Sequence, residues 1–518
     1  MSIQAENTDK FIEGYVTDVT YTMNYKSELN PLLVQFNFLC AGLRPPIIKN
    51  ACELGFGQGL SINFHSAGSE IKWHGNDFNH HHFLFADELT KAGQLNCVLT
   101  PESFREFCQK ADLPDFDYIC LHGVWSWINS ENREVIVEFI KRKLRPNGVA
   151  YISYNALPGM MDALPIKKIL SDYSASLDDK INTIDKISLS IEFLDNFIKL
   201  NPEILKSFPN LLKKLEHLKI QPKHYLAHEY FNKNWMPFYF SEMKDQLSNA
   251  DLKYAAPVYV IDLFKNLFLT DEQYKFIENI PNHNDKESLV DKLVNKQFRA
   301  DFWVKNIEYL EEDEYEDLMS KCSIILITNI DQIEFKFDTY TGIIDINEEH
   351  AKRILNILSD YKIHSIGEIS KQLRNHNEAM NNIATIIALL IYKKDVALVH
   401  NEISQETRNK TKNLNMFIIA RSIISEDINY LVSPLTGGGI FINNLEQIYL
   451  VARERGLSSP EEWVKFAWDV HLWRAGNILD DKRGTTFPKD KEGEEMIEHA
   501  VNWNKYRLPI LKALEITN

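Results

Sequence analysis

The sequence predicts an α/β fold centred on a largely parallel β-sheet, with further domains attached to it. Short apolar segments alternate with helical ones between residues 49 and 154, which is typical of strands joined by helical crossovers. Glycines at 55, 57 and 59 form a turn where the first strand gives way to a helix. The length of 518 residues suits roughly two to four domains rather than one.

The elements of this sheet follow in order along the first half of the chain. A buried helix is expected over 32–39, between Pro31 and Gly42. Strands are expected at 49–54, 71–76, 95–99, 116–122 and 148–154, the last one preceded by a turn at 145–148. Residues 166–221 lack glycine and repeat apolar residues at helical spacing, which predicts a helical insertion that packs on another element or on a second subunit. A helix near 242–250 and a strand near 253–260 then complete the sheet.

The second half of the chain gives weaker patterns. Residues 262–320 are predicted to be helical and acidic, with a solvated face at 311–314. Strands at 322–328, 332–337 and 340–346, followed by helices at 348–361, 366–374 and 379–391, indicate an α+β unit of winged-helix character. The predicted domains are a Rossmann-like core (1–165 and 222–262), a helical insertion (166–221), a middle domain (263–347) and a C-terminal domain (348–518).

Bulk composition narrows the class of protein. A formal charge of −16 argues against a general nucleic-acid-binding role, because such proteins need basic patches. The six cysteines include no C-x-x-C pair, so reduced thiols and a cytoplasmic location are expected. No apolar run approaches 18 residues, so no membrane insertion is expected.

The glycine turn carries the first functional signal. It reads E-x-G-x-G-x-G over 53–59, with Leu60 where a dinucleotide-binding loop has its third glycine. The carboxylate of Glu53 would repel a pyrophosphate, whereas it would hold a cationic amino-acid tail. The turn therefore favours S-adenosylmethionine over NAD, with Glu53, Gly55, Gly57 and Gly59 in the cofactor site.

Two more segments offer places for the rest of a nucleoside. Asp77, followed by Phe78 and Asn79, comes after the second strand, where a carboxylate can accept both ribose hydroxyls. Glu102 and Ser103 follow the third strand, where they would suit an adenine amino group. The alternative for these residues is an ordinary loop or helix-cap role.

Candidate catalytic residues stand at the ends of the fourth and fifth strands. His122 and Trp125 are expected to face the sulfonium, although a core histidine beside packing tryptophans is the alternative. Tyr154 and Asn155 end the fifth strand, where they could orient an amine. The run His80–His82 is not expected to bind metal, because adjacent helical residues do not converge on one ion.

Four segments together resemble one known family: ELGFGQG at 53–59, GNDFN at 75–79, HGVWSWI at 122–128 and SYNALPG at 153–159. It is the family of class I S-adenosylmethionine-dependent methyltransferases with an appended methyltransferase regulatory domain, which includes rickettsial protein lysine methyltransferases of outer-membrane protein B. The likeness is strong over 15–160 and extends to 228–237 and 294–299. It implies a Rossmann-like core, a helical dimerisation insertion, and middle and C-terminal domains around an open cavity.

The sequence thus leads us to expect a methyltransferase that acts on lysine side chains of a protein, such as a bacterial outer-membrane protein, and that forms a homodimer. An aromatic pocket of Tyr21, Tyr25, Trp125 and Tyr154 would desolvate the acceptor amine, and His122 would relay its proton. Tyr25 is also expected to touch the cofactor, and the Tyr21–Tyr25 segment to close as a lid. Two alternatives stay open: a small-molecule acceptor, and a cofactor-sensing module that binds DNA.

Overall fold

Seven strands form the central sheet of the computed structural model, which describes residues 11–12, 15–16, 23–208, 210–281, 283–373, 379–474 and 491–518. Their spatial order is β5–β4–β3–β6–β7–β9–β8. The first five and β8 share one direction, whereas β9 runs antiparallel between β7 and β8. The strands are β3 (Asn50–Leu54), β4 (Lys72–Asn76), β5 (Cys97–Thr100), β6 (Phe116–Leu121), β7 (Leu144–Asn155), β8 (Lys253–Pro257) and β9 (Phe298–Val304).

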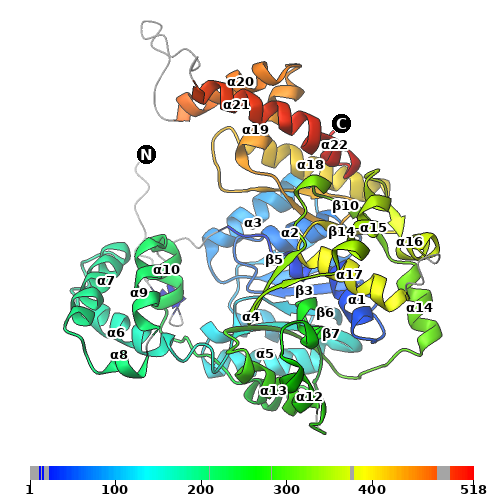
Figure 1. The fold of residues 1–518 in the computed structure, drawn as a ribbon. Helices are drawn as coiled ribbons and strands as arrows, with labels where there is room; N and C mark the ends of the chain where they lie inside the picture. The colour runs from blue at the N-terminus through cyan, green and yellow to red at the C-terminus, as the bar shows by residue number, and fades with distance from the viewer. Residues whose placement is uncertain are drawn as a thin grey trace, which may run out of the picture.

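Helices cover both faces of this sheet, which confirms the α/β prediction (Figure 1). One face packs against α1 (Pro31–Cys40), α2 (Leu60–Ala67) and α3 (His80–Gly93). The other packs against α4 (Phe104–Gln109), α5 (Ser130–Lys143) and α11 (Phe240–Ser248). Neighbouring residues of β3 alternate between the two cores, Ala51 with the first and Cys52 with the second, as the two-residue period of a strand requires.

Strand β9 corrects the prediction that residues 262–320 are wholly helical. It lies in the range predicted as the middle domain and yet pairs along its whole length with β7. Residues 145–148, predicted as a turn before the last strand, fall inside β7, where they interrupt its pairing with β6: Leu144 pairs with Phe116, and pairing resumes with Val149 opposite Tyr118.

Strand β9 carries a buried ion cluster. Arg299, 1% exposed, donates hydrogen bonds to Asp301, Asp291 and Glu287 at 2.7 to 3.0 Å. Burial raises the pKa of Glu287, but Lys265 and Arg299 outweigh it and lower that pKa to about 2. The cluster therefore ties β9 to the helix that carries Glu287 and Asp291.

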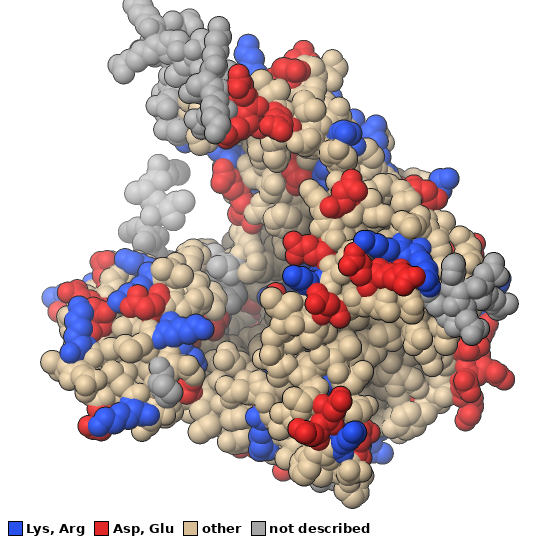
Figure 2. All heavy atoms as spheres, viewed as in Figure 1, with Lys and Arg blue, Asp and Glu red and all other residues tan. Residues whose placement is uncertain are grey.

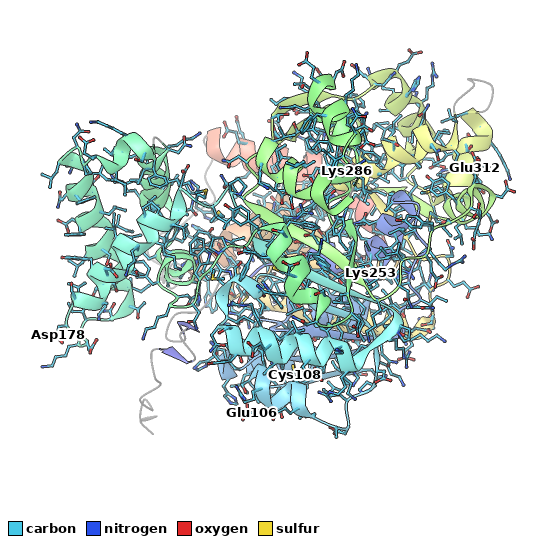
Figure 3. All side chains as sticks on the ribbon, turned by 90° about the horizontal axis from the view of Figure 1, so that it is seen from below. Glu106, Cys108, Asp178, Lys253, Lys286 and Glu312 are labelled. Carbon is cyan, nitrogen blue, oxygen red and sulfur yellow. The ribbon has the colours of Figure 1, made fainter. Side chains whose placement is uncertain are left out.

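A helical lobe stands beside the sheet, on the left of Figure 1, with Asp178 at its outer end in Figure 3. Its apolar core comes from the helical stripe of 166–221 and from residues just after it. The lobe consists of α6 (Ala163–Ser176), α7 (Thr183–Lys199), α8 (Ile204–Ser207), α9 (Leu211–Ile220) and α10 (Lys223–Tyr230).

A winged-helix-like unit follows the core. Its three-stranded sheet has the order β13–β10–β14, and its helices share a core with Phe36 and Leu39 of α1. Its elements are α14 (Glu312–Ser320), β10 (Ser323–Leu326), β11 (Lys336–Thr339), β12 (Gly342–Asp345), α15 (Glu348–Leu358), β13 (His364–Ser365), α16 (Ile366–Leu373), α17 (Met380–Tyr392) and β14 (Val396–Val399). Two helices that precede β9, α12 (Asp271–Glu278) and α13 (His283–Leu293), share a small apolar core of their own.

The last segment packs on the back of the glycine turn. Here α18 lies against α2 and α3, and the hairpin β15–β16 approaches so closely that a Cβ at Gly438 would stand 2.3 Å from the Tyr25 hydroxyl. The tripled glycine at 437–439 therefore serves close packing. The elements are α18 (Gln405–Arg421), β15 (Tyr430–Ser433), β16 (Gly438–Phe441), α19 (Asn444–Glu454), α20 (Pro460–Arg474), α21 (Lys491–Asn502) and α22 (Leu508–Ala513); a short hairpin, β1 (Phe11–Ile12) with β2 (Tyr15–Val16), precedes the core.

Candidate functional site

A cavity of about 710 Å³ opens at the carboxyl ends of the parallel strands. The loops after β3, β4, β6 and β7 form its floor, and the end of the helical lobe, residues 221–232, forms the opposite wall. The surface is hollowed between this lobe and the main body in Figure 2. Ligand sites of open α/β sheets lie in this crevice, where neighbouring crossovers leave the sheet on opposite faces.

The glycine turn after β3 is built from three left-handed residues. Gly55, Gly57 and Gly59 have φ of +70°, +58° and +72°. A Cβ at Gly55 would lie 2.8 Å from Val124 and one at Gly59 would lie 2.4 Å from Ala86, so these two glycines allow close packing. A Cβ at Gly57 would meet nothing within 4 Å. Gly57 thus faces the open cavity, where a ligand can approach the backbone.

Asp77, at the end of β4, binds the glycine turn directly. Its Oδ2 accepts a hydrogen bond from the Gly57 amide at 2.8 Å, and its Oδ1 accepts one from the Asn79 amide at 2.9 Å. His82 Nδ1 lies 3.2 Å from the same Oδ1. Because each carboxylate oxygen has two lone pairs, Oδ2 can accept one more hydrogen bond from a ligand hydroxyl.

Glu53 is the most unusual group of the cavity. It is 4% exposed, and its Oε2 has no hydrogen-bond partner among the described residues. Burial, and then the nearby Asp77 carboxylate, raise the pKa of Glu53 to about 8. Burying a charged carboxylate without a hydrogen-bond partner costs free energy. A cationic ligand group that donates a hydrogen bond to this oxygen would supply the missing partner.

His122 follows β6 and is held as a neutral ring. Its Nδ1 lies 2.7 Å from the Tyr151 hydroxyl and 3.6 Å from a Glu28 carboxylate oxygen. Burial lowers the pKa of His122 to about 4. The cavity is closed on this side by Asn24, Lys26 and Glu28, and the Lys26 amide donates to Ser61 Oγ at 2.9 Å.

Comparison with known proteins identifies the chain's relatives. Residues 222–305 match the family model described as a predicted methyltransferase regulatory domain. The uncharacterized protein sll1526 of Synechocystis sp. is 32% identical over 515 residues, which cover 98% of this chain and 99% of that protein. The chain belongs to this family of methyltransferases with a regulatory domain.

Two further similar proteins come from Rickettsia. The uncharacterized protein RP789 of Rickettsia prowazekii is 27% identical over 300 residues, which cover 55% of this chain and 51% of that protein. The solved structure of PKMT2 from Rickettsia typhi in complex with AdoHcy has the same fold, with a TM-score of 0.67 at 18% identity, over 95% of this chain and 99% of that one.

The cavity of this family member brings together most of the residues that the sequence singled out. Those that line it are Glu53, Gly55, Gly57, Gly59, Asp77, Phe78, Asn79, His122 and Asn155. Tyr21 lies outside the described residues, as does Thr22, whereas residues 23–25 of the predicted lid are described.

Five predicted residues lie elsewhere. Trp125 and Tyr154 are buried in the core beneath α5 and α11, where the Tyr154 hydroxyl donates to Asp301 at 3.0 Å. Tyr25 turns away from the cavity toward His65, whose Nε2 is 3.0 Å from its hydroxyl. Glu102 pairs with Lys110 at 2.7 Å, and Ser103 caps α4.

The structure adds lining residues that sequence reasoning missed, among them Lys26, Glu28, Trp127, Ile128 and Tyr225. Trp127 stands two positions after Trp125 in the same motif. The motif therefore indicated a tryptophan at the site, but it did not indicate which of the two faces the cavity. Tyr225 precedes the 228–230 segment of the family resemblance and carries no local signal of its own.

Proposed function

We propose that the protein is an S-adenosylmethionine-dependent methyltransferase that methylates lysine side chains of a protein. The observation that carries this proposal is the buried Glu53 carboxylate, whose Oε2 has no partner among the described residues and which lines the same cavity as the open backbone of Gly57. Such an oxygen suits the ammonium of a methionine moiety. The presence of AdoHcy in the rickettsial PKMT2 structure supports the same cofactor here.

The remaining cavity residues fit the rest of the cofactor. The free lone pair of Asp77 Oδ2 would accept a ribose hydroxyl, and the Phe104 ring, which also lines the cavity, would flank an adenine. When bound, the cofactor supplies a methyl group on a sulfonium. The chain's own residues then have to place a neutral amine in line with it, which makes positioning the main catalytic task.

A lysine must lose its proton before it can attack, and an ordinary lysine with a pKa near 10.4 is almost fully charged at neutral pH. Trp127, Ile128 and Met160 line the cavity and would desolvate an incoming amine, which lowers its pKa. His122, with its pKa lowered to about 4, is a weak base. In this proposal it orients groups through Tyr151, and the amine proton leaves to water.

The acceptor can be assigned by incubating the protein with methyl-labelled cofactor and a bacterial lysate. Label in lysine residues of protein is the expected result. Label that stays in the soluble small-molecule fraction would contradict a protein acceptor and favour the small-molecule alternative.

The DNA-binding alternative has less support. Basic and acidic side chains are mixed on the face shown in Figure 2, and the formal charge is −16. Tight cofactor binding with no transfer to any acceptor, together with salt-sensitive DNA binding, would favour it.

We also propose that the helical lobe forms a homodimer contact. Apolar side chains of the lobe stay on its surface, with Leu200 78% and Ile220 77% exposed. No described helix is long and apolar enough to cross a bilayer. Sedimentation of the protein and of Leu200→Ser with Ile220→Ser tests the contact: the wild type should be dimeric and the double variant should shift toward monomer.

A further inference from the structure

A lysine of the chain itself sits between two tryptophans at the edge of the cavity. Lys167, on α6 of the helical lobe, is 8% exposed. Its Nζ lies 5.0 Å from the ring centroid of Trp127 and 5.0 Å from that of Trp235. Aromatic faces at this distance attract an ammonium group and accept a methylated one equally well.

The pair of indoles is held in place by its surroundings. The ring centroids of Trp127 and Trp235 are 6.1 Å apart. The amide of Met236, next to Trp235, donates to the carbonyl of Ser126, next to Trp127, at 2.8 Å. Trp127 lines the cavity that we propose for the methyl donor, and it belongs to the loop after β6. Lys167 is not itself a lining residue, but it contacts two residues that line the proposed reaction site, Trp127 and Glu229.

The amine has few partners for its charge. Besides the two rings, Nζ donates a hydrogen bond to the backbone carbonyl of Glu229 at 3.3 Å, and the charge of the nearby Glu229 carboxylate favours the protonated amine. Burial lowers the pKa of Lys167 to about 7. At neutral pH a far larger share of this amine is then uncharged than the roughly one in a thousand of an ordinary lysine.

We propose that Lys167 is a site of self-methylation, on the basis of its position between Trp127 and Trp235 at the edge of the cavity. The proposal rests on the proposed function, because it uses the same methyl donor. The Nζ lone pair forms a bond to the methyl carbon while the carbon–sulfur bond breaks and its electron pair stays on sulfur. The methylated nitrogen then releases a proton to water before it can accept another methyl.

The modification has a consequence for the site. An unmodified amine loses its charge above about pH 7, whereas a trimethylated one stays cationic at every pH. Self-methylation would thus fix a positive charge between the two indoles, beside the Glu229 side chain that lines the cavity.

Peptide mass spectrometry of the full-length protein tests the proposal. After incubation with saturating S-adenosylmethionine, the peptide that contains Lys167 should gain one to three methyl groups, about tenfold faster at pH 8 than at pH 6. The gain should be lost in Lys167→Arg, and in Glu53→Gln it should be slower than in the wild type when the cofactor is below saturation. The methylation of Lys167 should be kept in Lys168→Arg, which is the matched control. Lys168 is the next residue along the chain, its side chain is 75% exposed, and it pairs with Asp172.

Calorimetry with S-adenosylhomocysteine separates the two proposals. Binding without any methyl on Lys167 would overturn self-methylation and leave the proposed function intact, whereas no binding would overturn both. A second readout needs no cofactor: acetylation of lysines by a small reagent should show Lys167 titrating near pH 7. Titration near pH 10, as for exposed lysines, would contradict the arrangement from which the proposal is drawn.

Discussion

At the scale of single residues, Glu53 makes the affinity for the proposed ligand depend on pH. Its carboxyl holds a proton below about pH 8 when the cavity contains no cation. An ammonium group binds the carboxylate and not the acid, so binding should release a proton. The affinity for a ligand with a cationic amino group should therefore rise with pH up to about 8 and then level off.

Glu53→Gln should remove this pH dependence. The variant keeps the size of the side chain but loses a charge-assisted hydrogen bond, which is worth about 1.5–3 kcal/mol, or at least about tenfold in affinity at pH 8. Calorimetry with S-adenosylhomocysteine between pH 6 and 8 measures both effects. A wild-type affinity that is flat over this range would argue against the role of Glu53.

Substitution of Gly57 tests whether the ligand contacts the protein backbone at this position. Gly57→Ala introduces a left-handed alanine, at a cost of about 1–2 kcal/mol, and directs a methyl group into the cavity. Gly42→Ala is the matched control, because Gly42 has φ +70°, has equally open space for a Cβ, and does not line the cavity. Both variants should lose similar stability on thermal melting, and Gly57→Ala should also lose cofactor affinity; equal affinities would contradict the site.

At this scale the sequence does not show which of two adjacent strand residues faces the cavity. Tyr154 and Asn155 are neighbours on β7, and only Asn155 lines the cavity. Both faces of a parallel sheet are covered by helices, so hydrophobicity does not reveal which face a strand residue takes. The glycine turn was predictable because its backbone demands glycine whatever packs around it.

At the scale of elements, β9 shows why part of the sheet was missed. Most of the parallel strands contain short apolar runs, and their positions could be predicted within a few residues. Strand β9 contains Arg299 and Asp301, which interrupt its apolar pattern, and their charges are compensated by Glu287 and Asp291 from a helix. That compensation depends on tertiary contacts, which no local window contains.

Arg299→Met should destabilise the fold strongly. It leaves Asp291 and Asp301 buried without the cation that binds them, and Glu287 with Lys265 alone, which typically costs about 3–5 kcal/mol. The loss should be larger at pH 7 than at pH 5, because at higher pH the orphaned carboxyls must be ionised. Denaturant unfolding measures it. The control Arg145→Met breaks an ion pair with Asp117 whose arginine is 43% exposed and should cost under about 1 kcal/mol.

At the scale of the whole molecule, the site is assembled from distant parts of the chain. The sheet supplies the glycine turn, residues 24–28 close one side, and the helical lobe closes the other (Figure 1). Periodicity predicted the lobe as helical, but the meeting of its last helix with the cavity arises only from the folded arrangement.

Tyr225 should separate acceptor binding from cofactor binding. It lines the cavity from α10, opposite the glycine turn. Tyr225→Ala should reduce methyl transfer to protein by about tenfold or more while it leaves the affinity for S-adenosylhomocysteine within about twofold. Tyr173→Ala, in the same lobe but stacked on Phe193, should change neither. A loss of cofactor affinity in Tyr225→Ala would contradict this division.

The central claim is that the crevice at the carboxyl edge of the sheet binds S-adenosylmethionine. Asp77 and Asp117 test it as a pair, since both are 7% exposed and Asp117 lies at the opposite edge, where it accepts the amides of Lys49 and Asn50. Calorimetry with S-adenosylhomocysteine should show binding to the wild type and to Asp117→Asn, and at least about tenfold weaker binding to Asp77→Asn. Equal affinity of Asp77→Asn and the wild type would contradict the claim.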